Sequence, residues 1–289
     1  MNQMSKPPAA MAIDFTRPKG ETALLAPDSV QWRVFKNPVA MAVGGVAAVL
    51  LEFADARIRS GVWDHSIYKV DPIGRSQRTG MAAMVGVYGP ASTARRVIAG
   101  VGRMHAKVAG TTPKGEAYRA LDPELLNWVY ATAQYGFLTA YHRFVRPLSA
   151  ADQARYWREG EPVAALYGVT ETPKSEAEFL AMMEALLPRF EPHPINIEFL
   201  DIIQSGRAAP SVPRFLHKAL ARAAVSLLPP VVRTRLDLGA DYDLTLRDRM
   251  MVKTMARLAD RVKDRNAPAW QAAERLGLPG DTAWRRAPA

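Results

Sequence analysis

Apolar side chains recur every third or fourth residue along most of this chain, and this spacing most limits how it can fold. The clearest series follows Asp122 and Pro123, a capping residue and a proline that together mark the start of a helix. Its apolar members are Leu126, Val129, Ala133, Phe137, Ala140, Tyr141 and Phe144. One face of a long helix accounts for this spacing, whereas a strand would need strict alternation.

Similar patterns predict helices over 39–60, 75–88, 90–108, 149–159 and 245–263, with a further helix starting at Ser175 and its partner Glu178. The 90–108 segment presents Val97, Val101, Met104 and Val108 on one side, and Gly110 is expected as its C-cap. The 245–263 segment is expected to turn Met251, Met255, Leu258 and Val262 inward. Alternating strand patterns and Asn-Gly hairpin turns are missing. The sequence therefore predicts an all-α protein.

We expect one multi-helix domain over residues 29–289, preceded by a flexible arm over residues 1–28 that is rich in Pro, Ala and Lys. The longest apolar run, Val39–Leu51, has 13 residues, whereas a membrane-spanning helix needs about 20. The first residues do not resemble a secretory signal. We expect a cytoplasmic protein whose 39–51 segment is a buried helix.

The charge of the chain is basic and uneven. The net charge is +10, and the stretch from residue 203 onward contributes most of it, with 16 Lys and Arg against 8 Asp and Glu. Such a region is typical of a solvated face, and it also suits peripheral contact with an anionic membrane. Nucleic acid is not an expected partner, since no zinc-finger or RNA-binding motif accompanies the charge.

The absence of cysteine excludes disulfides, zinc–thiolate sites, iron–sulfur clusters and cysteine nucleophiles. No Glu-x-x-His pair supports a di-iron bundle site, and no phosphate-binding glycine loop or Gly-x-Ser-x-Gly elbow occurs. Any metal would therefore depend on the five histidines or on oxygen ligands.

Of these histidines, His105 is the strongest candidate for a ligand. It follows Val101 by four residues and precedes Val108 by three, so it lies on the apolar side of its helix. One interpretation is a hydrogen-bonded core histidine, and the other is an axial ligand to haem iron, for which neutral imidazole is common. His65, expected in a loop, is a candidate for the distal side of a pocket. The sequence offers no reason to assign His142, His193 or His217 as ligands.

Arg75, Arg78 and Thr79 form the second candidate group. Spacings of three and four residues place all three on one helical face. A solvated basic corner is the simpler interpretation. The alternative is a polar cluster directed into a pocket, where the arginines meet acidic groups of a cofactor or bound oxygen and the threonine hydroxyl donates to an oxygen species.

Several fragments in order resemble the catalytic domain shared by rubber oxygenases (latex clearing protein) and MpaB-type oxygenases. They are DHSIYKVDPIGRSQRTG, VYGPASTARRVIAGVGRMHAKVAG, GEAYRALDPELLNWVYATAQYGFLTAYHRFV, LSAADQARYWREGEPVAALYGV and PKSEAEF. The resemblance extends from about residue 29 to about residue 265. It implies an all-helical, globin-like core around haem b, with His105 as the proximal iron ligand.

The resemblance also implies roles for the second group. Arg75 and Thr79 match the distal R-x-x-K/R-T motif, and Arg78 stands where rubber oxygenases carry a lysine able to approach the iron. Because an arginine stays protonated, it is a poor metal ligand, and a lysine-capped state is not expected here. Neither the export signal of the rubber-degrading members nor the membrane helix of the fungal ones is expected, so a secreted polymer is not the expected substrate.

The leading hypothesis is a haem b-dependent oxygenase that uses O₂ on an apolar, unsaturated small molecule such as an isoprenoid or lipid chain. The catalytic candidates are Arg75, Arg78 and Thr79, the iron ligand is His105, and Arg75 and His65 are further cofactor-binding candidates. Two alternatives stay open: a haem-binding sensor or carrier without turnover, and a haem-free helical interaction protein with a basic C-terminal region.

Overall fold

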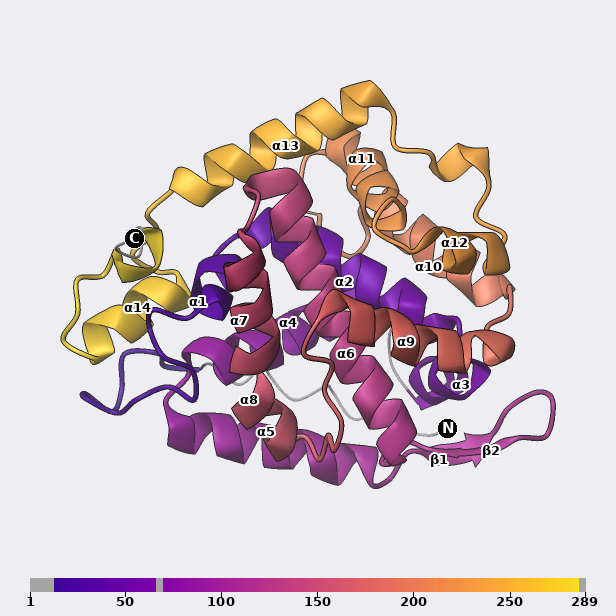
Figure 1. Ribbon diagram of the computed structural model, residues 1–289, viewed down its shortest axis with the longest axis horizontal. Helices are drawn as coiled ribbons and strands as arrows, with labels where there is room; N and C mark the ends of the chain where they lie inside the picture. The colour runs from indigo at the N-terminus through magenta and orange to yellow at the C-terminus, as the bar shows by residue number, and fades with distance from the viewer. Residues whose placement is uncertain (1–12, 66–69, 211, 286–289) are drawn as a thin grey trace.

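The protein is built almost entirely of helices, as the sequence predicts (Figure 1). The structure, a computed structural model, describes residues 13–65, 70–210 and 212–285. The helices are α1 (Val30–Phe35), α2 (Pro38–Phe53), α3 (Ala56–His65), α4 (Pro72–Tyr88), α5 (Ala91–His105), α6 (Pro123–Ala140), α7 (Ala150–Glu159), α8 (Glu161–Leu166), α9 (Glu176–Leu186), α10 (Pro194–Gln204), α11 (Arg214–Val225), α12 (Pro230–Arg235), α13 (Leu246–Arg261) and α14 (Pro268–Arg275). Short 3₁₀ turns and one π-helical turn, Tyr141–Val145, complete them.

The sequence predicts the first residues of the helices more accurately than their other features. Asp122, Ser149, Ser175 and Thr245 each accept a hydrogen bond from a backbone N–H in the first turn of the following helix. These caps satisfy donors that have no partner inside the helix, and they depend only on residues close in sequence. The predicted starts of α6, α7, α9 and α13 are therefore confirmed.

The predicted 39–60 helix is in fact two helices. The break lies at Ala54 and Asp55, and the Asp55 carboxylate accepts from the backbone N–H of Arg57 at 2.9 Å and pairs with the Arg57 guanidinium at 2.7 Å. Asp55 also forms a β-bridge with Phe190. This long-range bridge draws the chain aside at a point where the local pattern would continue the helix.

The strand-free prediction is wrong for one hairpin. Strands β1 (Ala109–Thr111) and β2 (Ala117–Arg119) pair antiparallel, with Gly110 opposite Tyr118. Gly110 is therefore a strand residue and not the C-cap of α5. A Cβ at Gly110 would lie 2.6 Å from the Tyr118 hydroxyl oxygen, so the close pairing needs a glycine. Each strand is too short to show an alternating pattern.

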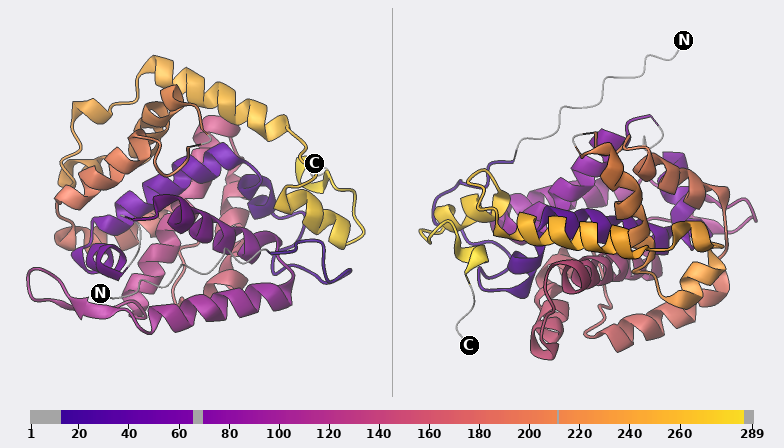
Figure 2. Two further views of the ribbon diagram at one scale, coloured as in Figure 1. Left: turned by 180° about the vertical axis from the view of Figure 1, so that it is seen from behind. Right: turned by 90° about the horizontal axis from the view of Figure 1, so that it is seen from above.

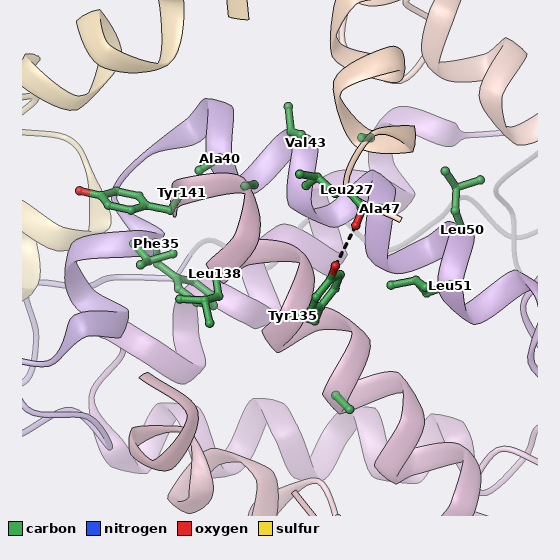
Figure 3. Packing of buried hydrophobic residues seen from close by; sticks show 14 of the residues in the cluster. Phe35, Ala40, Val43, Ala47, Leu50, Leu51, Tyr135, Leu138, Tyr141 and Leu227 are labelled. Atoms are coloured by element: carbon green, nitrogen blue, oxygen red, sulfur yellow. Dashed lines mark hydrogen bonds between the residues drawn. The ribbon is translucent and has the colours of Figure 1, made fainter. Parts of the chain in front are cut away.

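Helices α2 and α6 cross at the centre of the molecule, and their backbones nearly touch (Figures 1 and 3). A Cβ added to Gly44 of α2 would lie 2.6 Å from the carbonyl oxygen of Gly136 in α6. Around this crossing, Leu50, Leu51 and Leu138 are buried, and the Tyr135 hydroxyl donates to the Leu227 carbonyl at 2.9 Å (Figure 3). The two glycines thus set how closely the central helices approach.

The two ends of the described chain meet beside α4. Residues 13–29 contain no helix, but Phe15 and Leu25 are buried. The buried guanidinium of Arg275 donates to the carbonyl oxygens of Phe15, Glu21 and Tyr88 at 2.7 to 2.9 Å. The part of the predicted arm that the structure describes is therefore held against α14 and the end of α4.

The remaining helices surround α2 and α6, with α5 and α13 at opposite edges of the molecule (Figures 1 and 2). The predicted inward face of α13 is partly wrong, because Leu258 and Val262 are 56% and 61% exposed while Val252 and Ala256 are buried. Within the described ranges, no helix combines the length and the apolar character needed to cross a bilayer.

Candidate functional site

The candidate site residues lie on α4 and α5, which follow one another in sequence and pack together. The Asp71 carboxylate caps α4 by accepting from the Gly74 N–H at 2.8 Å, and Pro72 occupies the first helical position. Only the last turn of α4 is fully buried, and in α5 only Ala94 and Ile98 are. The first half of α4 and the second half of α5 thus keep accessible surface.

Arg75 and Thr79 are in direct contact. The Arg75 guanidinium donates to the Thr79 hydroxyl, which in turn donates to the Arg75 carbonyl at 3.1 Å. Arg78 lies 3.8 Å from the Asp71 carboxylate at the start of the helix. The predicted triplet therefore separates into an Arg75–Thr79 pair and an arginine that faces the N-cap.

His105 is the last residue of α5 and is half-buried. It follows the buried Ala94 and Ile98 at helical spacing, so it lies on the inner face, whereas Met104, predicted for that face, is 61% exposed. Burial lowers the pKa of His105, and the charge of Arg75 lowers it further. In the part of the chain that the structure describes, the His105 imidazole has no hydrogen-bond partner.

Glu52 of α2 is a member of the site that sequence reasoning missed. Burial raises its pKa to about 7, although the charge of Arg75 and a 3.3 Å hydrogen bond from the Thr132 hydroxyl oppose that rise. The sequence feature that could have identified Glu52 is its position directly after the longest apolar run. Arg75 is thus an electrostatic neighbour of both Glu52 and His105, and it links α2, α4 and α5.

Apolar side chains on these helices are only partly buried, although they belong to the interior of the fold. They are Met41, Val46 and Val49 of α2, Ala83 and Met84 of α4, Val97 of α5, and Val129 and Phe137 of α6. Glu52 and Thr132 stand on the same two central helices, and a Cβ at Gly45 would lie 3.7 Å from the Phe137 ring. Helices α2, α4, α5 and α6 therefore retain some accessible apolar surface.

His65 does not join this group through any contact that the described residues make. It is the exposed last residue of α3, not part of a loop as predicted, and its Nε2 lies 3.2 Å from the Tyr118 hydroxyl. Residues 66–69, which follow it, lie outside the described residues. Its assignment to the cofactor site stays a prediction.

The other histidines have evident structural contacts. His142 Nδ1 accepts from the Leu148 N–H at 3.0 Å, and His193 caps α10 by accepting from the Ile195 N–H at 3.2 Å. His217 is buried in α11, where a Cβ at Gly206 would lie 2.5 Å from its Nε2. These contacts explain the three residues without a ligand role.

Two open clefts lie away from these residues. One, of about 580 Å³, is lined by Glu124, Asn127 and Met182 among others, and the second, of about 400 Å³, by Asp55, Arg189 and Glu191 among others. Neither includes the candidate residues. Among the described residues, no cluster of three or more His, Asp or Glu side chains could hold a metal ion.

The raised pKa of Glu52 predicts a pH-dependent stability. Between about pH 4.5 and 7 the folded protein keeps a proton that the unfolded chain releases, so stability falls as pH rises through this range and levels off above it. Glu52→Gln should therefore be about 3 kcal/mol more stable than the parent at pH 8 and nearly equal to it at pH 4.5. Urea unfolding at both pH values measures this difference.

The matched control is Glu184→Gln, at an exposed position of α9. It should change the free energy of unfolding little, and equally at both pH values. An equal effect of Glu52→Gln at pH 4.5 and pH 8 would contradict the proton held at this carboxyl.

A comparison with known families identifies the family of the chain. The model of the family described as ER-bound oxygenase mpaB/B′/Rubber oxygenase, catalytic domain, matches residues 32–261, which include α2 to α13 and every candidate site residue. Neither the search of curated proteins nor that of solved structures found a match. The matched segment is most of the chain, so the protein belongs to the mpaB/B′ and rubber oxygenase catalytic-domain family.

Proposed function

We propose that the protein is a haem b-dependent oxygenase that acts on an apolar, unsaturated small molecule, and that His105 is the iron ligand. The observation that carries this proposal is the position of Arg75, which interacts electrostatically with both His105 and Glu52. A candidate ligand, a cation and a candidate acid–base group thus surround one region.

The residues present fit a haem. His105 is half-buried, has no hydrogen-bond partner among the described residues, and has a lowered pKa that favours the neutral, ligating imidazole. Haem, when bound, supplies the iron at which dioxygen is activated. The macrocycle provides four of the iron's ligands, so the protein needs to supply a single side chain and an apolar slot.

The polar side chains near His105 have different proposed roles. Arg75 supplies a fixed positive charge, and Thr79 a hydroxyl whose position that arginine sets. The Glu52 carboxyl, with its pKa of about 7, is suited to hold or accept a proton near neutral pH. Arg78 is directed toward Asp71, which argues against direct approach to the iron.

The substrate class follows from the partly buried apolar side chains of α2, α4, α5 and α6. An apolar ligand would cover this surface and exclude water from the polar pair Arg75 and Thr79. Rubber, named in the family description, is a polymer of unsaturated isoprenoid units, and a shorter isoprenoid or lipid chain is the substrate that we propose.

An absorption spectrum with iron quantification on protein from haem-supplied cells tests the cofactor. We expect a Soret band at about 400 nm, as in other b-type haem proteins, and about one iron atom per chain. Oxygen consumption with an unsaturated isoprenoid tests the activity. Haem without oxygen consumption would favour a sensor or carrier, and a colourless protein that cannot be reconstituted would favour a haem-free interaction module.

Thr79→Ala is expected to keep the haem spectrum and to lower kcat about 100-fold, because it removes the hydroxyl that would donate to an oxygen species and leaves His105 unchanged. Thr79→Ser, which keeps the hydroxyl, is the control and should keep most of the activity. Steady-state oxygen uptake measures both variants. Equal activity in the two would show that the hydroxyl has no part in turnover.

A further inference from the structure

The outward face of α13 carries a feature that the oxygenase activity does not explain. Leu246, Met250, Leu258 and Val262 are 56% to 75% exposed on this helix and at its end. Isolated exposed apolar residues are ordinary, but these four recur at four-residue intervals or multiples of them. These side chains extend over about 24 Å along α13, with the exposed Thr254 between Met250 and Leu258. Helix α13 lies at one edge of the molecule (Figures 1 and 2).

The acidic and the basic side chains of α13 lie on different sides of the helix. Its two aspartates face the protein: Asp248 pairs with Arg222 at 2.8 Å, and the buried Asp260 pairs with Lys36 and with Arg146. Arg247, Arg249, Arg257 and Arg261 are exposed, and none has a carboxylate partner among the described residues. The solvent side of the helix therefore presents apolar side chains and positive charges, with no exposed acid on the helix itself.

We propose that this face of α13 docks on an anionic lipid bilayer. A helix lying in the bilayer interface buries apolar side chains at the acyl boundary while arginines meet lipid phosphates and carboxylates. Leu246, Met250 and Leu258 alternate with Arg247, Arg257 and Arg261 around the exposed side, so both kinds of contact form at once.

Charge complementarity favours this occupant over the others. A symmetric dimer through α13 would oppose arginines with arginines. A nucleic acid would use the positive charges but would gain little from Leu258 or Val262, because phosphate contacts are polar. The bilayer surface is the partner that uses both the apolar and the cationic side chains of this face.

A flotation assay with lipid vesicles tests the proposal. The vesicles consist of phosphatidylcholine with about 30% phosphatidylserine, a share of anionic lipid typical of a strongly anionic leaflet. We expect binding to these vesicles that weakens as salt rises, and at least about 10-fold weaker binding to phosphatidylcholine alone. Equal binding to both vesicle types, or none to either, would overturn the proposal.

Two sets of variants assign the binding to α13. Arg247→Gln/Arg261→Gln and Met250→Ser/Leu258→Ser should each weaken binding at least about 10-fold. Controls are Arg95→Gln/Arg96→Gln on α5, at the opposite edge of the molecule, and Leu121→Ser before α6. All these side chains are exposed, so the thermal unfolding temperature of each variant should equal that of the parent. A lower unfolding temperature would identify a folding defect.

The pattern across variants identifies the occupant. Loss in both α13 variants with the controls unaffected supports lipid docking. Loss in the arginine variant alone, together with tight binding of the parent to duplex DNA, would replace lipid by a polyanion. A parent that is dimeric by sedimentation and becomes monomeric as Met250→Ser/Leu258→Ser would replace it by a second copy of this chain.

Discussion

His105→Ala is expected to yield a folded protein without haem absorption, the largest effect that we predict for any single side chain. In the proposed function His105 is the side chain that would bind the iron, so its removal would leave the cofactor held by apolar contacts alone. Absorption between about 350 and 700 nm, with iron content per chain, measures the loss. His142→Ala is the matched control and should keep the parent spectrum, because His142 is also half-buried and its Nδ1 accepts from the Leu148 N–H.

A second variant separates lost ligation from lost folding. His105→Gly should also purify without haem, and free imidazole with added haem should restore a Soret band, because the half-buried position admits a small ligand. A His105→Ala spectrum identical to the parent's would show that another residue binds the iron. Failure of imidazole to restore binding, with normal circular dichroism, would show that lost ligation at residue 105 does not account for the missing haem.

Gly44→Ala is expected to lower the stability of the protein strongly. The new Cβ would lie 2.6 Å from the Gly136 carbonyl oxygen, and because that atom belongs to the backbone of α6, the two helices must separate. We expect a loss of about 3 kcal/mol, which is a large share of the roughly 5–15 kcal/mol that stabilises a typical domain. The melting temperature should fall by about 6–12 °C.

Gly45→Ala is the matched control, one residue along the same helix. Its added Cβ would meet only the Phe137 ring, at 3.7 Å, which is an ordinary contact distance. Because alanine favours helix over glycine by about 1 kcal/mol, this variant should be as stable as the parent or more so. Equal melting temperatures for the two variants would mean that α2 and α6 are not held together at Gly44.

The helix boundaries could be predicted because they depend on short-range chemistry. Asp122, Ser149 and Ser175 cap helices through residues two or three positions away, so the sequence alone contains the contact. The break at Asp55 was missed although the Asp55 carboxylate also accepts from an N–H two residues on, because the apolar pattern continues past it. The bridge to Phe190, which is distant in sequence, is the part that local patterns do not contain. The hairpin was missed for a related reason, because its strands are short and gain stability only by pairing.

The site was predictable in part. The spacing of Arg75 and Thr79 correctly places them on one face, and the resemblance singled out His105. Glu52 was missed because its significance comes from burial and from the charge of Arg75, which belongs to a different helix. Titration behaviour depends on three-dimensional surroundings, and spacing along one helix carries no information about them.

The contacts of Arg275 impose an order on biosynthesis. Its guanidinium donates to the Phe15 carbonyl across 260 residues of chain, so the segment around Phe15 cannot complete its contacts until α14 has been synthesised. At about 5–20 residues per second, this leaves Phe15 and Leu25 without their final partners for tens of seconds. Nascent chains of this protein should therefore rely on chaperones near the N-terminus, and completion of α14 should release them.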